Sequence, residues 1–193
     1  MKIFLCVALV AGFYSCHREN LTYDKPYVDF DSLVRTQVLK LSGIKAIVRK
    51  KTSLNGKRDS TVFTPDSTQW KHELDAFQQL DVINKPLYKG NYQQSYRDDQ
   101  HSNLIVHSYL AKVKSPVPEV KFFYRPNSKK IERIEAFFAD GNWIYTTSRK
   151  MILEFEESHG MPVIAGYQVH GFQKMMGNDT VKFSIEGKLK YPD

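Results

Sequence analysis

Two stretches in the first half of the chain place apolar residues at helical spacing. The first begins at Asp31, a candidate N-cap, and Gly43 offers a stop signal. The second begins after Asp66 and should end near Asn84, because Pro86 disfavours helical backbone in the residue before it. The core-facing residues are Leu33, Val34, Val38 and Leu41 in the first stretch, and Trp70, Leu74, Phe77 and Leu80 in the second. The pattern predicts two amphipathic helices.

Other segments have the two-residue period of strands that bury one face. Asn55-Gly56 separates residues 46–54 from 58–64, and Asn-Gly between two such runs is the strongest short signal for a hairpin. Several later segments exceed the usual strand length of about 5 to 6 residues, which favours a curved, bulged sheet. From Asn103 onward, turn signals divide the chain into six strands, and these signals are Ser115-Pro116, Pro126-Asn127, Asp140-Gly141, His159-Gly160 and Gly177-Asn178.

The alternation is cleanest in the last of these strands. One face takes Val181, Phe183, Ile185, Gly187, Leu189 and Tyr191, and the other takes Lys182, Ser184, Glu186, Lys188 and Lys190. One face of the sheet should therefore be buried and the other should face water. The sequence predicts an α+β fold, in which two helices pack on a curved antiparallel sheet formed by an N-terminal hairpin and a C-terminal six-strand meander.

The amino terminus has the layout of a secretory signal peptide. Met1-Lys2 is a short charged region, and an apolar run follows from Ile3 to about Tyr14. The run covers roughly a dozen residues, whereas a helix needs about 20 to cross a membrane. We therefore expect residues 1–15 to direct export and then to be removed, although the ordinary signal peptidase could instead use the small residues Val10 and Gly12.

Ser15-Cys16 follows the apolar run directly and resembles the lipobox of bacterial lipoprotein precursors, in which a small residue precedes an invariant cysteine. The resemblance implies that the Cys16 thiol receives diacylglycerol, that the precursor is cut before Cys16, and that the new amino group is acylated, for example with palmitate. Phe13 and Tyr14 depart from the family pattern, which prefers Leu and a small residue there. Two or more acyl chains anchor a protein stably, since each buried methylene contributes about 0.8 kcal/mol.

This interpretation divides the chain into three parts. Residues 1–15 form the signal peptide, residues 16–27 form the lipidated cysteine and its tether, and residues 28–193 form a single α+β domain. Cys6 would leave with the signal peptide and Cys16 would carry lipid, so we expect no disulfide. The expected location is the cell envelope outside the cytoplasm, at the outer membrane of a Gram-negative cell, held by the lipid anchor.

The chain is basic, with a net charge of +7 and an isoelectric point near 9.3. In an exported protein this charge favours anionic lipid, an acidic glycan or an envelope protein as the partner, and not nucleic acid. A surface that is basic without any ligand is the alternative. The hairpin offers the candidate residues for contact with an anionic surface, which are Lys45, Arg49, Lys50, Lys51, Lys57 and Arg58.

The sequence offers no complete catalytic or metal-binding motif. His72-Glu73 begins like the zinc motif HExxH, but Ala76 stands where the second histidine is needed. If His101 and His107 lie on one extended strand, they are separated by about 20 Å and cannot share a metal. We therefore predict no catalytic residue, no metal ligand and no cofactor.

These observations lead to one leading hypothesis and two alternatives. The leading hypothesis is a non-enzymatic envelope lipoprotein that presents a sheet surface to a partner, a glycan or a lipid. The first alternative is a carrier of hydrophobic ligands, similar in outline to the half-barrel lipoprotein carriers of the Gram-negative envelope, with a cavity lined by Phe122, Tyr124, Phe137, Phe138, Trp143 and Tyr145. The second is an envelope glycan hydrolase using carboxylates such as Glu154, Glu156 and Glu157, whose roles depend on their separation in space.

Overall fold

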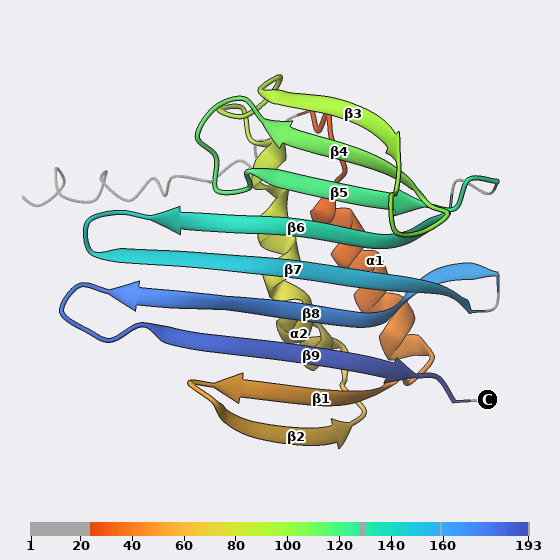
Figure 1. The fold of residues 1–193 in the computed structure, drawn as a ribbon. Helices are drawn as coiled ribbons and strands as arrows, with labels where there is room; N and C mark the ends of the chain where they lie inside the picture. The colour runs from red at the N-terminus through yellow and green to blue at the C-terminus, as the bar shows by residue number, and fades with distance from the viewer. Residues whose placement is uncertain (1–23, 128–129, 159, 193) are drawn as a thin grey trace, which may run out of the picture.

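The computed structural model describes residues 24–127, 130–158 and 160–192, which form two α-helices and nine strands (Figure 1). The helices are α1 (Phe30–Gly43) and α2 (Ser67–Gln78), and α2 continues into a 3-10 helix, η1 (Gln79–Asn84). The strands are β1 (Ile47–Leu54), β2 (Lys57–Phe63), β3 (Tyr92–Asp98), β4 (Ile105–Ala111), β5 (Glu119–Tyr124), β6 (Ile131–Gly141), β7 (Tyr145–Ser158), β8 (Met161–Met175) and β9 (Val181–Lys190).

All nine strands belong to one antiparallel sheet, in the order β2-β1-β9-β8-β7-β6-β5-β4-β3. Strands β3 to β9 follow one another as a meander, and the β1–β2 hairpin joins the sheet by pairing β1 with β9. The register shifts between Phe123 and Tyr124 and again between Glu154 and Phe155, so the sheet is bulged, as its long strands predict.

The α+β class is confirmed, but the prediction of a six-strand meander is wrong, because the meander has seven strands. The additional strand is β3, at the edge of the sheet. Only Tyr92 of this strand is buried, and the six residues after it are exposed. An edge strand with so little burial has no apolar face, and the sequence therefore carries no two-residue period in this segment.

The local signals for the helices and the hairpin are largely confirmed. Helix α2 begins with a capping box, in which Asp66 and Gln69 accept from each other's backbone N–H groups at 2.8 and 2.9 Å. Asn55 and Gly56 have φ values of 48° and 86°, as the tight turn of a hairpin requires. The N-cap of α1 is Asp29 and not Asp31, since the Asp29 carboxylate accepts from the Ser32 N–H at 2.9 Å.

Both helices pack on the same face of the sheet, and Figure 1 shows them behind the strands. The side chains between the two layers form the core, which includes the fully buried Trp70, Phe77, Phe122, Leu153 and Tyr167. No helix of the described residues covers the opposite face of the sheet (Figure 1). We call this uncovered surface the open face.

The segment before α1 is held against the domain. Tyr27, expected in the tether, packs edge-on against the rings of Tyr92 and Tyr109, with centroids 5.3 and 5.5 Å away. The signal peptide, residues 1–15, and the lipidated Cys16 both lie outside the described residues and stay predictions. Within residues 24–127, 130–158 and 160–192, no helix combines the length and the apolar character needed to cross a membrane.

Candidate functional site

Strand alternation places basic side chains on one region of the open face. Val48 of β1 is buried under the helices, so its neighbours Arg49 and Lys51 point the other way. The strand register continues this pattern across β2, β9, β8 and β7. The cations brought together are Arg49, Lys51, Arg58, Lys150, Lys174, Lys182, Lys188 and Lys190, and the carboxylates Glu154 and Glu186 lie among them. We call this region the basic face.

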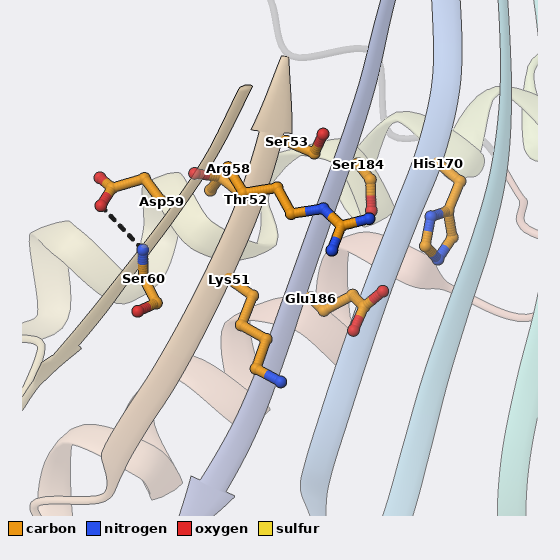
Figure 2. Close-up of a pocket in the computed structure, with 9 residues that line it drawn as sticks. All are labelled: Lys51, Thr52, Ser53, Arg58, Asp59, Ser60, His170, Ser184 and Glu186. Atoms are coloured by element: carbon orange, nitrogen blue, oxygen red, sulfur yellow. Dashed lines mark hydrogen bonds between the residues drawn. The ribbon is translucent and has the colours of Figure 1, made fainter. Parts of the chain in front are cut away.

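The basic face contains a hollow of about 820 Å³. Figure 2 shows the Arg58 side chain extending from β2 over β1 toward Ser184 and Glu186 of β9, with Lys51 beside it. The residues that line the hollow are Lys51, Thr52, Ser53, Arg58, Asp59, Ser60, His170, Ser184 and Glu186.

The register explains why side chains so distant in sequence meet here. One row across four strands consists of Arg58, Ser53, Ser184 and His170. The next row consists of Ser60, Lys51, Glu186 and Gln168. Directly opposed residues in antiparallel strands have Cβ atoms about 5 Å apart, so each row presents its polar groups as a continuous array.

The hollow combines several kinds of hydrogen-bonding group. Its cations donate charge-assisted hydrogen bonds, its hydroxyls donate or accept, and the carboxylates of Asp59 and Glu186 accept. His170 contacts the Gln168 side chain at 3.2 Å, which holds the imidazole over β8. Phe172 pairs with Lys182 on the same face and is 38% exposed, so an apolar ring borders the polar array.

The structure divides the six hairpin cations predicted as contact residues. Arg49, Lys51 and Arg58 lie on the basic face. Lys45 lies in the turn after α1, with a φ of 51°. Lys57 alternates with Arg58 and therefore points to the opposite side of β2.

Lys50 also faces the helices and is part of a contact between the sheet and α2. Its ammonium group lies 2.7 Å from one oxygen of Glu73, and the Tyr167 hydroxyl donates to the other at 2.5 Å. Burial, together with the Glu73 carboxylate, raises the pKa of Tyr167 above its ordinary range. Glu73 is thus engaged in packing α2 onto the sheet, while His72 is exposed on the helix surface.

Sequence reasoning missed the residues that β8 and β9 add to the hollow. The alternation in β9 already places Lys182, Ser184 and Glu186 on one face. The pairing of β1 with β9, however, joins segments about 130 residues apart, and no local signal encodes it. His170 had no signal at all, because a single histidine in a strand is common.

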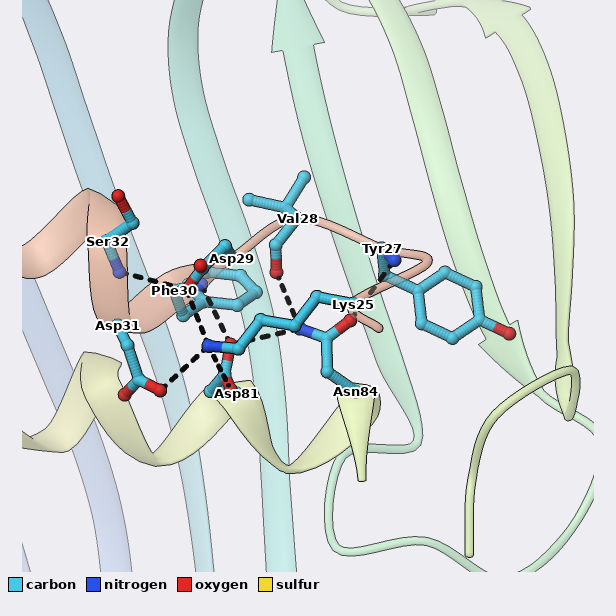
Figure 3. Close-up of polar contacts among 9 residues, drawn as sticks. All are labelled: Lys25, Tyr27, Val28, Asp29, Phe30, Asp31, Ser32, Asp81 and Asn84. Atoms are coloured by element: carbon cyan, nitrogen blue, oxygen red, sulfur yellow. Dashed lines mark hydrogen bonds and ion pairs between the residues drawn. The ribbon is translucent and has the colours of Figure 1, made fainter. Parts of the chain in front are cut away.

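One acidic cluster has the geometry of a metal site but already holds a cation. Oxygens of Asp29, Asp31 and Asp81 lie within 4.8 Å of one another. The ammonium group of Lys25 contacts all three, at 2.7, 2.8 and 2.8 Å (Figure 3). Asn84 also donates to Asp81, at 2.9 Å. The cluster therefore links the segment before α1 to η1 through an internal ammonium.

The histidines and aromatic residues singled out in the sequence lie in different places. His107 is buried in β4, where it stacks on Tyr96 at 3.9 Å and burial lowers its pKa, whereas His101 lies in the preceding turn. Phe122 packs in the core against Phe30, at 6.0 Å, while Trp143 is 77% exposed. The hydrolase candidates Glu156 and Glu157 line a small pocket with Glu132, Arg125 and Lys130. The carrier and hydrolase hypotheses both remain predictions.

Comparison of the chain with family models, with curated proteins and with solved structures finds no match.

Proposed function

We propose that this protein is a binding protein of the cell envelope that holds an acidic glycan on its basic face. The observation that carries the proposal is the hollow in which a row of Arg58, Ser53, Ser184 and His170 crosses the sheet with Lys51 in the next row (Figure 2). We further propose that residues 1–15 export the chain and that lipidation of Cys16 anchors it, so the domain would meet envelope glycans outside the cytoplasm.

The mixture of groups favours a glycan over other anions. A sugar carries many hydroxyls that both donate and accept hydrogen bonds, and the hollow offers the serine hydroxyls and Glu186 as partners. Lys51 and Arg58 supply the charge that a uronate or sulfate group needs. Phe172 at the border offers an apolar surface to the C–H groups of a sugar ring.

The shape of the site also supports binding of a linear glycan. A hollow of about 820 Å³ lies within the ~300–1,000 Å³ typical of ligand sites. The cations extend beyond the hollow along β9 to Lys188 and Lys190. A linear glycan that fills the hollow would therefore meet further positive charge along the sheet.

Calorimetric titration of the full chain carrying Cys16→Ser tests the proposal with an oligosaccharide of uronic acids and a neutral oligosaccharide of equal length. We expect the acidic ligand alone to bind at low salt. Arg58→Ala and Lys51→Ala should each weaken binding about tenfold, which corresponds to about 1.4 kcal/mol. Lys57→Ala is the matched control, since Lys57 adjoins Arg58 but points to the other side of β2, and it should change affinity less than twofold.

Two results would contradict the proposal. Equal binding of the acidic and neutral oligosaccharides would show that the cations do not determine which ligand binds. An equal loss of affinity in Lys57→Ala and Arg58→Ala would show only nonspecific attraction to the hairpin. Mass spectrometry of the oligosaccharide recovered after incubation with the protein should show that it is not cleaved. A cleaved product would instead favour the hydrolase alternative.

A further inference from the structure

Two neighbouring turns at one end of the sheet expose a group of large apolar side chains. Trp143 and Ile144 lie in the β6–β7 turn, Met175 is the last residue of β8, and Met176 follows it in the β8–β9 turn. Their exposed fractions are 77%, 43%, 46% and 64%. We call these four residues the apolar tip.

Backbone hydrogen bonds hold the two turns together as one surface. The Met176 N–H donates to the Ile144 carbonyl at 2.7 Å, and Tyr145 pairs with Met175 in the β7–β8 ladder. The Asn142 side chain fixes the first turn by accepting from the N–H groups of Ile144 and Tyr145, at 2.8 and 3.1 Å. The backbone therefore holds the residues of the apolar tip next to one another as one exposed surface.

The charges beside the apolar tip are mixed, with positive charge continuing onto the sheet. Lys174 precedes Met175, and Lys182 lies at the start of β9, where it joins the basic face. The nearby acids are Asp140 and Asp179, and the Asp140 carboxylate accepts a hydrogen bond from the Tyr145 hydroxyl at 2.8 Å. Beyond the turns, the cations of β9, β1 and β2 outnumber the carboxylates.

We infer that the apolar tip docks the protein on the surface of an anionic lipid bilayer. Tryptophan favours the membrane interface because its ring is apolar and its N–H group remains hydrated. Flexible methionines adapt to an irregular surface such as packed acyl chains. The adjacent lysines would then meet lipid phosphates, and each cation near such a surface adds attraction that salt screens.

The projecting shape favours a bilayer over a second copy of the chain. The apolar tip consists of two turns at strand ends, whereas a stable protein interface requires two extended complementary surfaces. A bilayer accepts a projecting group without complementarity of shape. This inference does not depend on the proposed glycan binding or on the lipidation of Cys16.

The fluorescence of Trp143 provides a direct test. The chain contains two tryptophans, and Trp70 is fully buried, so only Trp143 should respond to a bilayer. The full chain carrying Cys16→Ser is mixed with vesicles of phosphatidylcholine containing phosphatidylglycerol. We expect a blue shift of the emission and reduced quenching by acrylamide, and both effects should be absent in Trp143→Phe.

Vesicle sedimentation measures the contribution of the apolar tip. Trp143→Ser combined with Met176→Ser should lower vesicle binding at least tenfold. Leu39→Ser is the matched control, because Leu39 is 67% exposed on α1, away from the tip, and it should lower binding less than twofold. All variants retain the same amino terminus, so any contribution of residues 1–23 is equal among them.

Three results would overturn the inference. The first is vesicle binding with unchanged Trp143 emission, which would place the contact elsewhere. The second is equal binding to vesicles of phosphatidylcholine alone, which would remove the anionic requirement. The third is a blue shift that appears with protein concentration in the absence of lipid, which would identify a second copy as the partner.

Discussion

At the scale of single residues, Lys25 is held by an unusual concentration of negative charge. Its ammonium group contacts three carboxylates, and the Asp81 side chain among them is only 8% exposed. Asp29 caps α1, and Asp81 accepts from the Phe30 N–H at 3.0 Å. Removing the lysine would leave three like charges together at the start of a helix.

The pKa values of the carboxyl groups in this cluster are shifted in different directions. Burial alone would raise the pKa of Asp29 and Asp31, but hydrogen bonds and attraction from Lys25 hold the pKa of both below the ordinary value. Their contribution to stability is present above the ordinary pKa and is lost as the pH falls through the lowered pKa. Burial raises the pKa of Asp81 despite Lys25, so its protonation favours the folded state as the pH falls.

We predict that Lys25→Met lowers the free energy of unfolding by about 1–3 kcal/mol at pH 7, between the values for exposed and for buried ion pairs. Without the ammonium, the three carboxylates repel one another and their pKa values rise. Lowering the pH to 4.5 should therefore reduce the cost of the substitution. Urea unfolding at pH 7, 5.5 and 4.5 measures this trend.

The control for this prediction is Lys89→Met. Lys89 pairs with Asp24 at 3.1 Å, but both side chains are well exposed, and such pairs contribute about 0–1 kcal/mol. A cost for Lys25→Met that does not change with pH would show that its role is packing and not charge.

At the scale of elements, the attachment of α2 to the sheet depends on a glycine in a neighbouring strand. Tyr167 of β8 reaches Glu73 of α2, and its ring crosses the position of Gly187 in β9. A Cβ atom on Gly187 would lie 2.2 Å from the ring. Gly187 therefore provides the space that lets β8 contact the helix.

We predict that Gly187→Ala destabilises the fold by about 1–3 kcal/mol, the usual cost of overpacking a core. The Tyr167 ring has no room to shift, because its side chain is fully buried and its hydroxyl is bound to Glu73. Gly43→Ala at the end of α1 is the control, since a Cβ there meets nothing within 4 Å. Thermal unfolding of the two variants gives the comparison, and equal melting temperatures would refute the prediction.

The sequence predicted those elements whose signals are local. The start of α2 after Asp66, the Asn55-Gly56 turn and strands β4 to β9 all have such signals, and all were found. Strand β3 was missed because its side chains are mostly exposed, and the cap of α1 was misplaced because Asp29 and Asp31 are equally good caps by sequence. Lys25 contacts both carboxylates, and the structure shows the cap at Asp29, which accepts from the Ser32 N–H.

The candidate site was less predictable than the fold. Charge density along the hairpin identified Arg49, Lys51 and Arg58, but it could not separate them from Lys50 and Lys57. Their separation depends on which face of β1 is buried, and this follows from the position of the helices. The contribution of β8 and β9 depends on pairing between distant strands, which only the assembled sheet defines.

At the scale of the whole molecule, the two proposed binding surfaces point in different directions. The basic face lies on the broad surface of the sheet, whereas the apolar tip lies at the ends of strands β6 to β9 (Figure 1). A bilayer that touches the strand ends would leave most of the sheet surface in water. A domain held in this way could bind a glycan while it rests on a membrane.

We therefore predict that vesicle-bound protein binds the acidic oligosaccharide with an affinity within threefold of that of the free protein. Labelled oligosaccharide should sediment with anionic vesicles only when the protein is present. Trp143→Ser with Met176→Ser should abolish this co-sedimentation but leave glycan binding in solution intact. Arg58→Ala should weaken glycan binding, and with it the co-sedimentation of the oligosaccharide, but should leave the sedimentation of the protein with vesicles unchanged. Raising salt should weaken glycan binding more than vesicle binding, since burial of the apolar tip is not screened by ions. If the oligosaccharide instead displaced the protein from vesicles, the two ligands would share the basic face, and the apolar tip would not be the membrane contact.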